Sequence, residues 1–315
     1  MKISKKIAII ISCVFVFMGI VCIMVGKVNG GSLLFHVDYQ KHEVSSGKDK
    51  QKMVVKNYSL EDTASIELNL DCSDLKLEEG DEFKITYTCL DDDVLTVSNE
   101  DKVTIIKEET CEKNGGIGIH IEWFGMGSGL SDNREVLLTI PKGKKFEQFT
   151  VTSSCGDVSF KELETDCADI TLDCGELNGT FAKDVEKSKI HVEYGDCKVS
   201  FGGNCGETDM LSDSGDIHVT YTGEAGISKI ASNYGDMNVT FNGNAKETSI
   251  ESDCGDVNMT VYGKKEDYQL DVRSECEYSI DGDEFESEHY TSGGTGANKM
   301  SVKMEYGELD LNFKS

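Results

Sequence analysis

The stretch SDSGDIHVTY, residues 212–221, decides the fold, because variants of it recur at a fixed interval along the chain. EYGDCKVSF precedes it at 193–201, and NYGDMNVTF and DCGDVNMTV follow it at 233–241 and 253–261. The phrase has a period of 20 residues, with one step shorter by a residue. Each unit contains a glycine followed by an acid, which predicts a structural turn column: Gly156, Asp157, Gly175, Glu176, Gly195, Asp196, Gly215, Asp216, Gly235, Asp236, Gly255 and Asp256.

Two further columns keep the same register and predict the core. Five residues before the glycine stand Ile170, Ile190, Met210, Ile230 and Ile250, and six after it stand Phe181, Phe201, Tyr221, Phe241 and Val261. Apolar and polar residues alternate after the turn, as expected of half-buried strands. A unit this small cannot bury its apolar face alone, so we expect stacked coils of two strands of about seven residues, with neighbouring coils ~4.8 Å apart.

The rest of the chain is expected to frame this stack. We predict a β capping section over residues 57–150, the repeat solenoid over 151–282, a surface loop over 283–299 and a terminal coil over 300–315. Residues 1–30 are predicted to form a membrane anchor with a short cytoplasmic tail, joined to the capping section by a linker over 31–56.

The anchor prediction rests on an apolar run of 19 residues, Ile7–Val25, which is long enough to cross ~30 Å of hydrocarbon as a helix. Lys2, Lys5 and Lys6 precede it and only Lys27 follows closely. By the positive-inside tendency, the amino terminus stays in the cytoplasm. We therefore expect a single-pass protein of the cell membrane whose carboxy-terminal domain is extracytoplasmic.

Charge narrows the range of partners. The formal net charge of the 315 residues is −27, which repels nucleic acid and anionic lipid headgroups. Stacked carboxylates in the acidic column also repel one another. Two remedies are compatible with the sequence: hydrogen bonds from backbone amides within each turn, or Ca²⁺ ions bridging successive carboxylates. We expect the first, and hence no metal and no cofactor.

The cysteines allow, but do not require, disulfides. Of the 12 cysteines, none has a CxxC or other metal-ligand spacing. Cys155 and Cys174 are expected to be neighbours on successive coils, at a Cα separation that a disulfide accepts. Buried free thiols acting as small apolar side chains remain the other interpretation.

No catalytic constellation is evident. The six histidines keep no common column, and the acids lie at turns instead of clustering on one sheet face. We predict that the chain is not an enzyme. A polysaccharide-active β-helix enzyme is the remote alternative.

One glycine-rich segment, residues 115–133, is the candidate for partner contact. It carries the only tryptophan, Trp123, beside Phe124 and Met126. Aromatic side chains on such a segment can stack on sugars or fill a partner's pocket. The alternative is that they plug the open end of the solenoid core.

Several stretches together resemble a known family: SIELNLDCSDLKLEEGDEFKITY at 65–87, EVLLTIPKG at 135–143, TVTSSCGDVSF at 150–160, and the glycine-aspartate units that follow. The chain resembles the bacterial "putative adhesin" family of unknown function, which includes LiaG-like envelope proteins. The resemblance spans residues 57–313. It implies an all-β, right-handed β-solenoid, similar to a single-stranded β-helix, commonly carried on an amino-terminal membrane segment.

The sequence therefore predicts a membrane-anchored binding or scaffold module at the bacterial cell envelope, an adhesin that contacts a cell-wall glycan or an envelope protein. The alternative is an accessory regulator or sensor of envelope stress that acts through a membrane partner.

Overall fold

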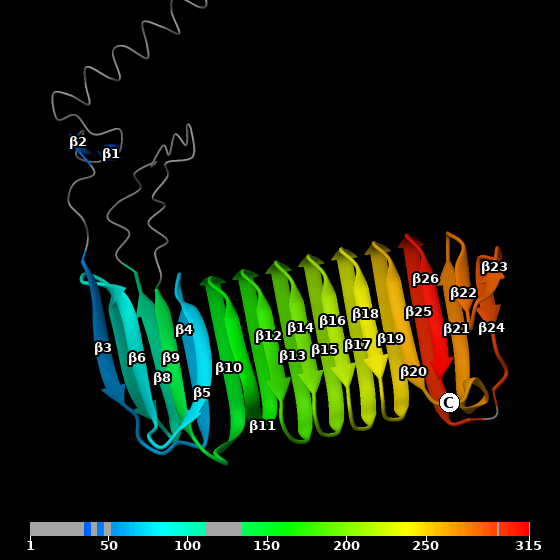
Figure 1. Ribbon diagram of the computed structural model, residues 1–315, viewed down its shortest axis with the longest axis horizontal. Coiled ribbons are helices and arrows are strands. Elements are labelled where there is room, and N and C mark those ends of the chain that lie inside the picture. Colours follow the sequence, from blue (N-terminus) through cyan, green and yellow to red (C-terminus); the bar gives the residue numbers. More distant parts are fainter. Residues whose placement is uncertain (1–34, 39–42, 47–51, 111–133, 295, 315) are drawn as a thin grey trace, which may run out of the picture. The chain divides into compact units, whose positions relative to one another are not determined.

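The computed structural model describes residues 35–38, 43–46, 52–110, 134–294 and 296–314. The chain divides into two compact units, Met1–Lys52 with Cys111–Asp132, and Met53–Thr110 with Asn133–Ser315. In the first unit, β1 (Phe35–Asp38) pairs antiparallel with β2 (Glu43–Ser46). The second unit holds the remaining strands (Figure 1).

The second unit is a β-solenoid built from two parallel sheets that share the long strand β11 (Val158–Cys174). We call them the long-strand sheet and the short-strand sheet. The long-strand sheet contains, in spatial order, β4 (Ser65–Leu70), β10 (Lys145–Cys155), β11, β13 (Val185–Tyr194), β15 (Cys205–Ser214), β17 (Ala225–Tyr234), β19 (Ala245–Cys254), β25 (Asn298–Tyr306) and β21 (Tyr268–Ser274).

The short-strand sheet runs through the same coils in the same order. It contains β5 (Asp74–Gly80), the start of β11, β12 (Leu177–Phe181), β14 (Cys197–Phe201), β16 (Ile217–Tyr221), β18 (Met237–Phe241), β20 (Val257–Tyr262), β26 (Leu309–Lys314) and β22 (Tyr278–Ile280). Each regular coil thus has one strand of 10 residues and one of 5, as in β13 and β14. The expectation of two equal strands was wrong in this respect.

The core consists of registered rows, as the columns predict. Ile170, Ile190, Met210, Ile230 and Ile250 are register partners in successive strands, and none is more than 1% exposed. In the aromatic column, the rings of Phe181, Phe201, Tyr221 and Phe241 stack nearly parallel, with centroids 4.9–5.1 Å apart. Repetition at one register therefore produces a continuous apolar interior between the sheets.

Antiparallel strands close the amino-terminal end of the stack. β6 (Lys84–Leu90) pairs antiparallel with β3 (Met53–Ser59) and β9 (Glu135–Pro141), and β7 (Val94–Glu100) pairs antiparallel with β8 (Val103–Glu109). β8 and β9 then pair parallel with the first coil, β4 and β5. The antiparallel strands thus cover an edge that would otherwise be open to pairing with another chain.

The carboxy-terminal end has an unexpected order. The last strands in sequence, β25 and β26, lie between β19–β20 and β21–β22 (Figure 1). The chain first builds the outermost coil, preceded by the short helix η1 (Lys265–Asp267), and then returns to fill the gap. The segment expected to be a surface loop contains β23 (Asp283–Phe285) and β24 (His289–Thr291), which pair antiparallel with β22 and β21. That expectation was wrong, because these strands cover the outermost coil.

A buried carboxylate completes the first turn of the solenoid. Glu108, on β8, is 3% exposed and accepts hydrogen bonds from the backbone N–H groups of Asp71, Cys72 and Ser73, at 2.9–3.3 Å. It also accepts bonds from the hydroxyls of Ser73 and Tyr87. Burial of the side chain raises the pKa of Tyr87, and its hydrogen bond to Glu108 raises that pKa further. The Tyr87 hydroxyl therefore keeps its proton and remains a donor.

Glu108→Gln is expected to lower the free energy of unfolding by about 2 kcal/mol, because the amide puts a donor among N–H groups that need an acceptor. Chemical denaturation of the variant measures this. Glu109→Gln, on the exposed side of the same strand, is the matched control and should remain near the parent. Equal stability of the two variants would mean that Glu108 does not support the turn.

Candidate functional site

The most regular surface of the described chain is the edge where each long strand turns into the following short strand. In the repeated coils, only the glycine and the acid of the phrase lie between the two strands, as with Gly215 and Asp216 between β15 and β16. Gly215 has φ = +142°, and a Cβ there would lie 2.1 Å from the carbonyl oxygen of Gly195 in the preceding coil. Glycine is therefore required both by the backbone conformation and by close stacking.

The acids of this edge form a ladder, which we call the acidic ladder: Asp74, Asp157, Glu176, Asp196, Asp216, Asp236, Asp256 and Glu308. The backbone N–H of one member donates to the Oδ1 atom of the member on the preceding coil. These N–O distances are 2.8–3.0 Å for the pairs Asp157–Asp74, Glu176–Asp157, Asp216–Asp196, Asp236–Asp216, Asp256–Asp236 and Glu308–Asp256.

These bonds correct one detail of the sequence interpretation. The carboxylates do accept bonds from backbone amides, but from the turn of the next coil instead of their own. Each bond places a partial positive charge against a carboxylate and joins neighbouring coils, which offsets repulsion between stacked acids. In the described part of the chain no equivalent bond joins the Asp196 N–H to Glu176, whose side chain is one methylene longer.

The residue before the turn glycine forms a second row on the same edge. Its members are Cys155, Cys174, Tyr194, Ser214, Tyr234, Cys254 and Tyr306, and they lie on consecutive coils. Tyr194, Tyr234 and Tyr306, which we call the tyrosine row, are 56%, 63% and 61% exposed. Three large aromatic side chains in line on every second coil make an ordered surface patch, unlike the scattered apolar residues of ordinary surfaces.

Two cysteines of this row, Cys155 and Cys174, are register neighbours, as predicted. Cys155 and Cys174 are exposed, and both thiols are free in the structure. Desolvation, followed by the neighbouring Cys155, raises the pKa of the exposed Cys174. Two other cysteines are buried, and their burial raises the pKa of Cys197 to about 12 and that of Cys205 to about 11. The thiolate is the reactive form of cysteine, so the thiols of Cys197 and Cys205 are protected from modification both by burial and by their raised pKa.

A thiol-directed reagent at neutral pH is therefore expected to modify Cys155 and Cys174 in the native chain, whereas Cys197 and Cys205 should react only after denaturation. Peptide mapping by mass spectrometry measures the modified fraction at each position. Modification of Cys197 or Cys205 at the rate of Cys155 would contradict the buried rows.

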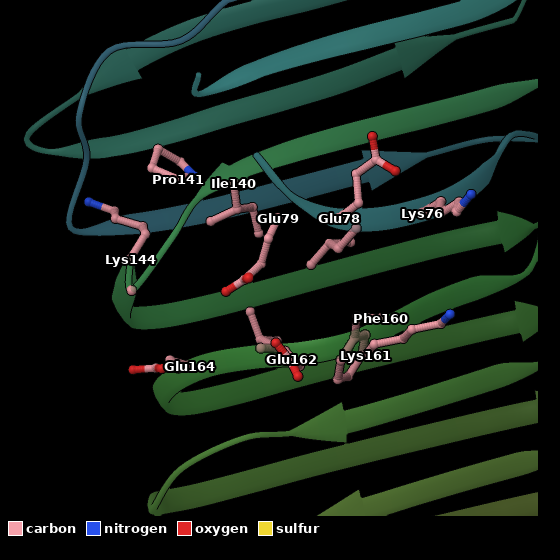
Figure 2. A pocket seen from close by; sticks show the side chains of 13 residues that line it. Lys76, Glu78, Glu79, Ile140, Pro141, Lys144, Phe160, Lys161, Glu162 and Glu164 are labelled. Carbon is pink, nitrogen blue, oxygen red and sulfur yellow. The ribbon is translucent and has the colours of Figure 1, made fainter. Parts of the chain in front are cut away.

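A hollow of about 340 Å³ lies where the short-strand sheet opens between β5 and β11 (Figure 2). The two strands pair only at Leu75–Val158 and Lys76–Ser159, whereas β5 continues to Gly80 and β11 bulges between Phe160 and Leu163. The floor of the hollow is apolar, from Leu77, Ile140, Phe160 and Leu163.

The rim of this hollow mixes charges of both signs. Carboxylates come from Glu78, Glu79, Glu162 and Glu164, and ammonium groups from Lys76, Lys144 and Lys161 (Figure 2). The Lys144 ammonium donates to the Asp62 carboxylate and to the Thr63 carbonyl oxygen. The rim therefore has mixed charge and no single set of donors or acceptors that converge on one point. For this reason the hollow indicates a class of ligand less clearly than the turn edge does.

The partner-contact residues expected from the sequence, Trp123, Phe124 and Met126, lie outside the described residues. The described histidines with polar contacts are dispersed. His191 Nε2 lies 3.0 Å from Asp213 Oδ2, His289 Nε2 lies 2.9 Å from Asp271 Oδ1, and His218 Nε2 lies 3.4 Å from Asn238 Nδ2. Over the described ranges, no group of three or more His, Cys, Asp or Glu side chains is arranged to hold a metal ion.

The predicted anchor, Ile7–Val25, also lies outside the described residues. Among the residues that the structure does describe, there is no helix of the length and apolarity that a membrane span needs.

Comparison with solved structures finds proteins of low sequence identity. A "putative adhesin" from Bacteroides fragilis NCTC 9343 matches with 11% identity and a TM-score of 0.44, over 83% of this chain and 98% of that one. A "putative cell adhesion protein" from Clostridium sporogenes ATCC 15579 matches with 12% identity and a TM-score of 0.22, over 84% and 100%. None of the curated proteins gives a significant match.

One family model, described as Toastrack DUF4097, matches residues 63–312. This span begins just before β4 and ends within β26, so it takes in every coil of the solenoid. The resemblance to a family of unknown function drawn from the repeated phrase is thereby confirmed: the chain belongs to the Toastrack DUF4097 family.

Proposed function

We propose that this chain is a membrane-anchored, extracytoplasmic binding and scaffold module of the bacterial cell envelope, and that it acts as an adhesin through the tyrosine row. The observation that carries the proposal is the alignment of Tyr194, Tyr234 and Tyr306 along one edge, each more than half exposed. Aromatic side chains combine a large apolar face with a hydroxyl group, the combination that dominates many binding surfaces.

The solenoid suits this role because it fixes the row in place. Each tyrosine ends a long strand that is hydrogen-bonded to its neighbours on both sides, and the glycine that follows it stacks directly on the preceding coil. A rigid array loses little conformational entropy when it binds an extended partner. The anchor predicted from Ile7–Val25 would hold this surface outside the membrane.

Sedimentation of the full-length chain with isolated bacterial cell walls tests the proposal. We expect the parent chain to pellet with the walls and the triple variant Tyr194→Ser, Tyr234→Ser, Tyr306→Ser to remain largely in solution. Tyr262→Ser removes a tyrosine that is 49% exposed but stands outside the row, so it is the matched control. If the triple variant pellets as well as the parent, the row is not the binding surface. Repeating the assay with a chelator shows whether binding to the cell walls depends on a divalent cation.

A further inference from the structure

The tyrosines of the tyrosine row lie at a regular spacing along the solenoid. They alternate with the smaller residues Ser214 and Cys254, so aromatic rings occur on every second coil. Neighbouring strands of a sheet lie ~4.8 Å apart, which places successive rings about 10 Å apart along a line. A ligand that contacts all three must be extended and must present equivalent groups at this interval.

An extended β-linked polysaccharide meets this requirement. Successive sugars of such a chain turn opposite faces outward, so the same face recurs once per disaccharide, over a length similar to that of two coils. The C–H groups on a sugar face pack on an aromatic ring, and the tyrosine hydroxyl can donate to, or accept from, the sugar hydroxyls. The small side chains of Ser214 and Cys254 leave room for the intervening sugar.

Carboxylates lie on both sides of the row. On the five coils from Tyr194 to Tyr306, the residue before the tyrosine, serine or cysteine is acidic or an amide, and the residue two positions after it belongs to the acidic ladder. The first set comprises Glu193, Asp213, Asn233, Asp253 and Glu305, and the second comprises Asp196, Asp216, Asp236, Asp256 and Glu308.

In the described part of the chain, printed ion pairs involve only two of these acids, Asp213 and Glu305. His191 pairs with Asp213, and Lys303 lies 3.7 Å from Glu305, whereas the ladder members at 196, 216, 236 and 256 use Oδ1 for the backbone of the next coil. Such a field repels anionic polymers and attracts cationic ones. Cations also interact favourably with the faces of tyrosine rings.

We infer that the tyrosine row binds an extended β-linked glycan that carries free amino groups, with the rings stacking on sugars and the flanking carboxylates receiving the ammonium groups. This inference rests on the proposed function and specifies its ligand. The two observations are independent, because the ring spacing selects the polymer and the flanking charge selects its amines.

The test compares binding of the full-length chain to three oligomers of equal length: an amino-bearing β-linked glucosamine oligomer, its fully N-acetylated form, and oligolysine. It is done under mildly acidic conditions, in which the sugar amines are protonated. We expect the glucosamine oligomer to bind about tenfold or more tightly than the acetylated one. The triple tyrosine variant should lose binding to both, and Tyr262→Ser should lose neither.

A second variant isolates the charge. Asp216→Asn with Asp236→Asn retains an Oδ1 acceptor for the ladder, as Asn204 does for the Glu224 N–H at 2.9 Å. This variant should keep its stability and lose the preference for the amino form. Equal binding of the amino and acetylated oligomers to the parent would overturn the amine inference and leave the proposed tyrosine contact standing. Binding of oligolysine alone would overturn the glycan inference, and loss of cell-wall binding by the triple variant would still support the row as the binding surface.

Discussion

Replacing Gly215 with alanine is expected to lower the free energy of unfolding by about 3 kcal/mol, a large effect for the addition of one methyl group. The new Cβ would lie 2.1 Å from the Gly195 carbonyl oxygen and 2.5 Å from its carbon, which are backbone atoms that cannot rotate away. In addition, φ = +142° is a conformation that residues with a side chain rarely adopt. Urea denaturation followed by circular dichroism measures the effect.

Gly293→Ala is the matched control for this substitution. Gly293 has no atom within 4 Å of the Cβ position. The control should stay within about 0.5 kcal/mol of the parent. If Gly215→Ala were as stable as Gly293→Ala, the turns could not be stacked as closely as the structure has them.

The second large effect is expected at Phe201, in the middle of the aromatic stack. Its ring lies between Phe181 and Tyr221, at centroid distances of 5.1 and 5.0 Å, and it is fully buried. Phe201→Ala should cost about 3–5 kcal/mol, because it removes a buried ring and leaves a cavity that two rigid sheets cannot close.

Phe201→Leu separates ring stacking from apolar burial. Leucine keeps most of the apolar volume and loses the parallel ring contacts, so its cost should be less than half that of the alanine variant. An exposed phenylalanine would tolerate both changes. A small effect of Phe201→Ala in the same denaturation assay would therefore mean that this row is not continuous in the native chain.

The stacking of the coils was predictable from the sequence because the period is constant. A column of Ile190, Met210 and Ile230 can be buried on one side only if equivalent positions lie on successive coils, and the register confirms this. The unequal strand lengths were not predictable from alternation. In β13, Glu186 and Lys187 both point outward between the buried Val185 and Ser188, so the alternation breaks inside a continuous strand.

The order of coils at the carboxy-terminal end could not be obtained from the order of the sequence. Gly307 repeats the tight turn, and a Cβ there would lie 2.1 Å from the carbonyl oxygen of Gly255. The segment between β21 and β22, residues 275–277, is longer and lacks the glycine. The first coil, with Ser73 at the corresponding place, also lacks it. The turn glycine is thus absent at the two ends of the stack. Its absence is a feature of the sequence that indicates which coils lie at the ends.

The candidate site was predictable only in part. The glycine-acid column correctly located the turn edge, and the row that contains Cys155 and Cys174 was identified through its cysteines. The tyrosines of that row were missed as a surface, because they alternate with serine and cysteine and their exposure depends on how the turn directs the side chain. In each repeated coil the residue before the glycine lies just beyond the last buried position of the long strand, for example Tyr194 after Val192.

Methyl NMR spectroscopy on the full-length chain with isotope-labelled isoleucine tests the stacking most directly. Ile170 and Ile190, and likewise Ile230 and Ile250, are register partners on adjacent coils, whereas Met210 separates Ile190 from Ile230. At ~4.8 Å between adjacent strands, the account predicts strong nuclear Overhauser cross-peaks within each adjacent pair and none between Ile190 and Ile230. Absence of both adjacent-pair cross-peaks in the folded chain would contradict it.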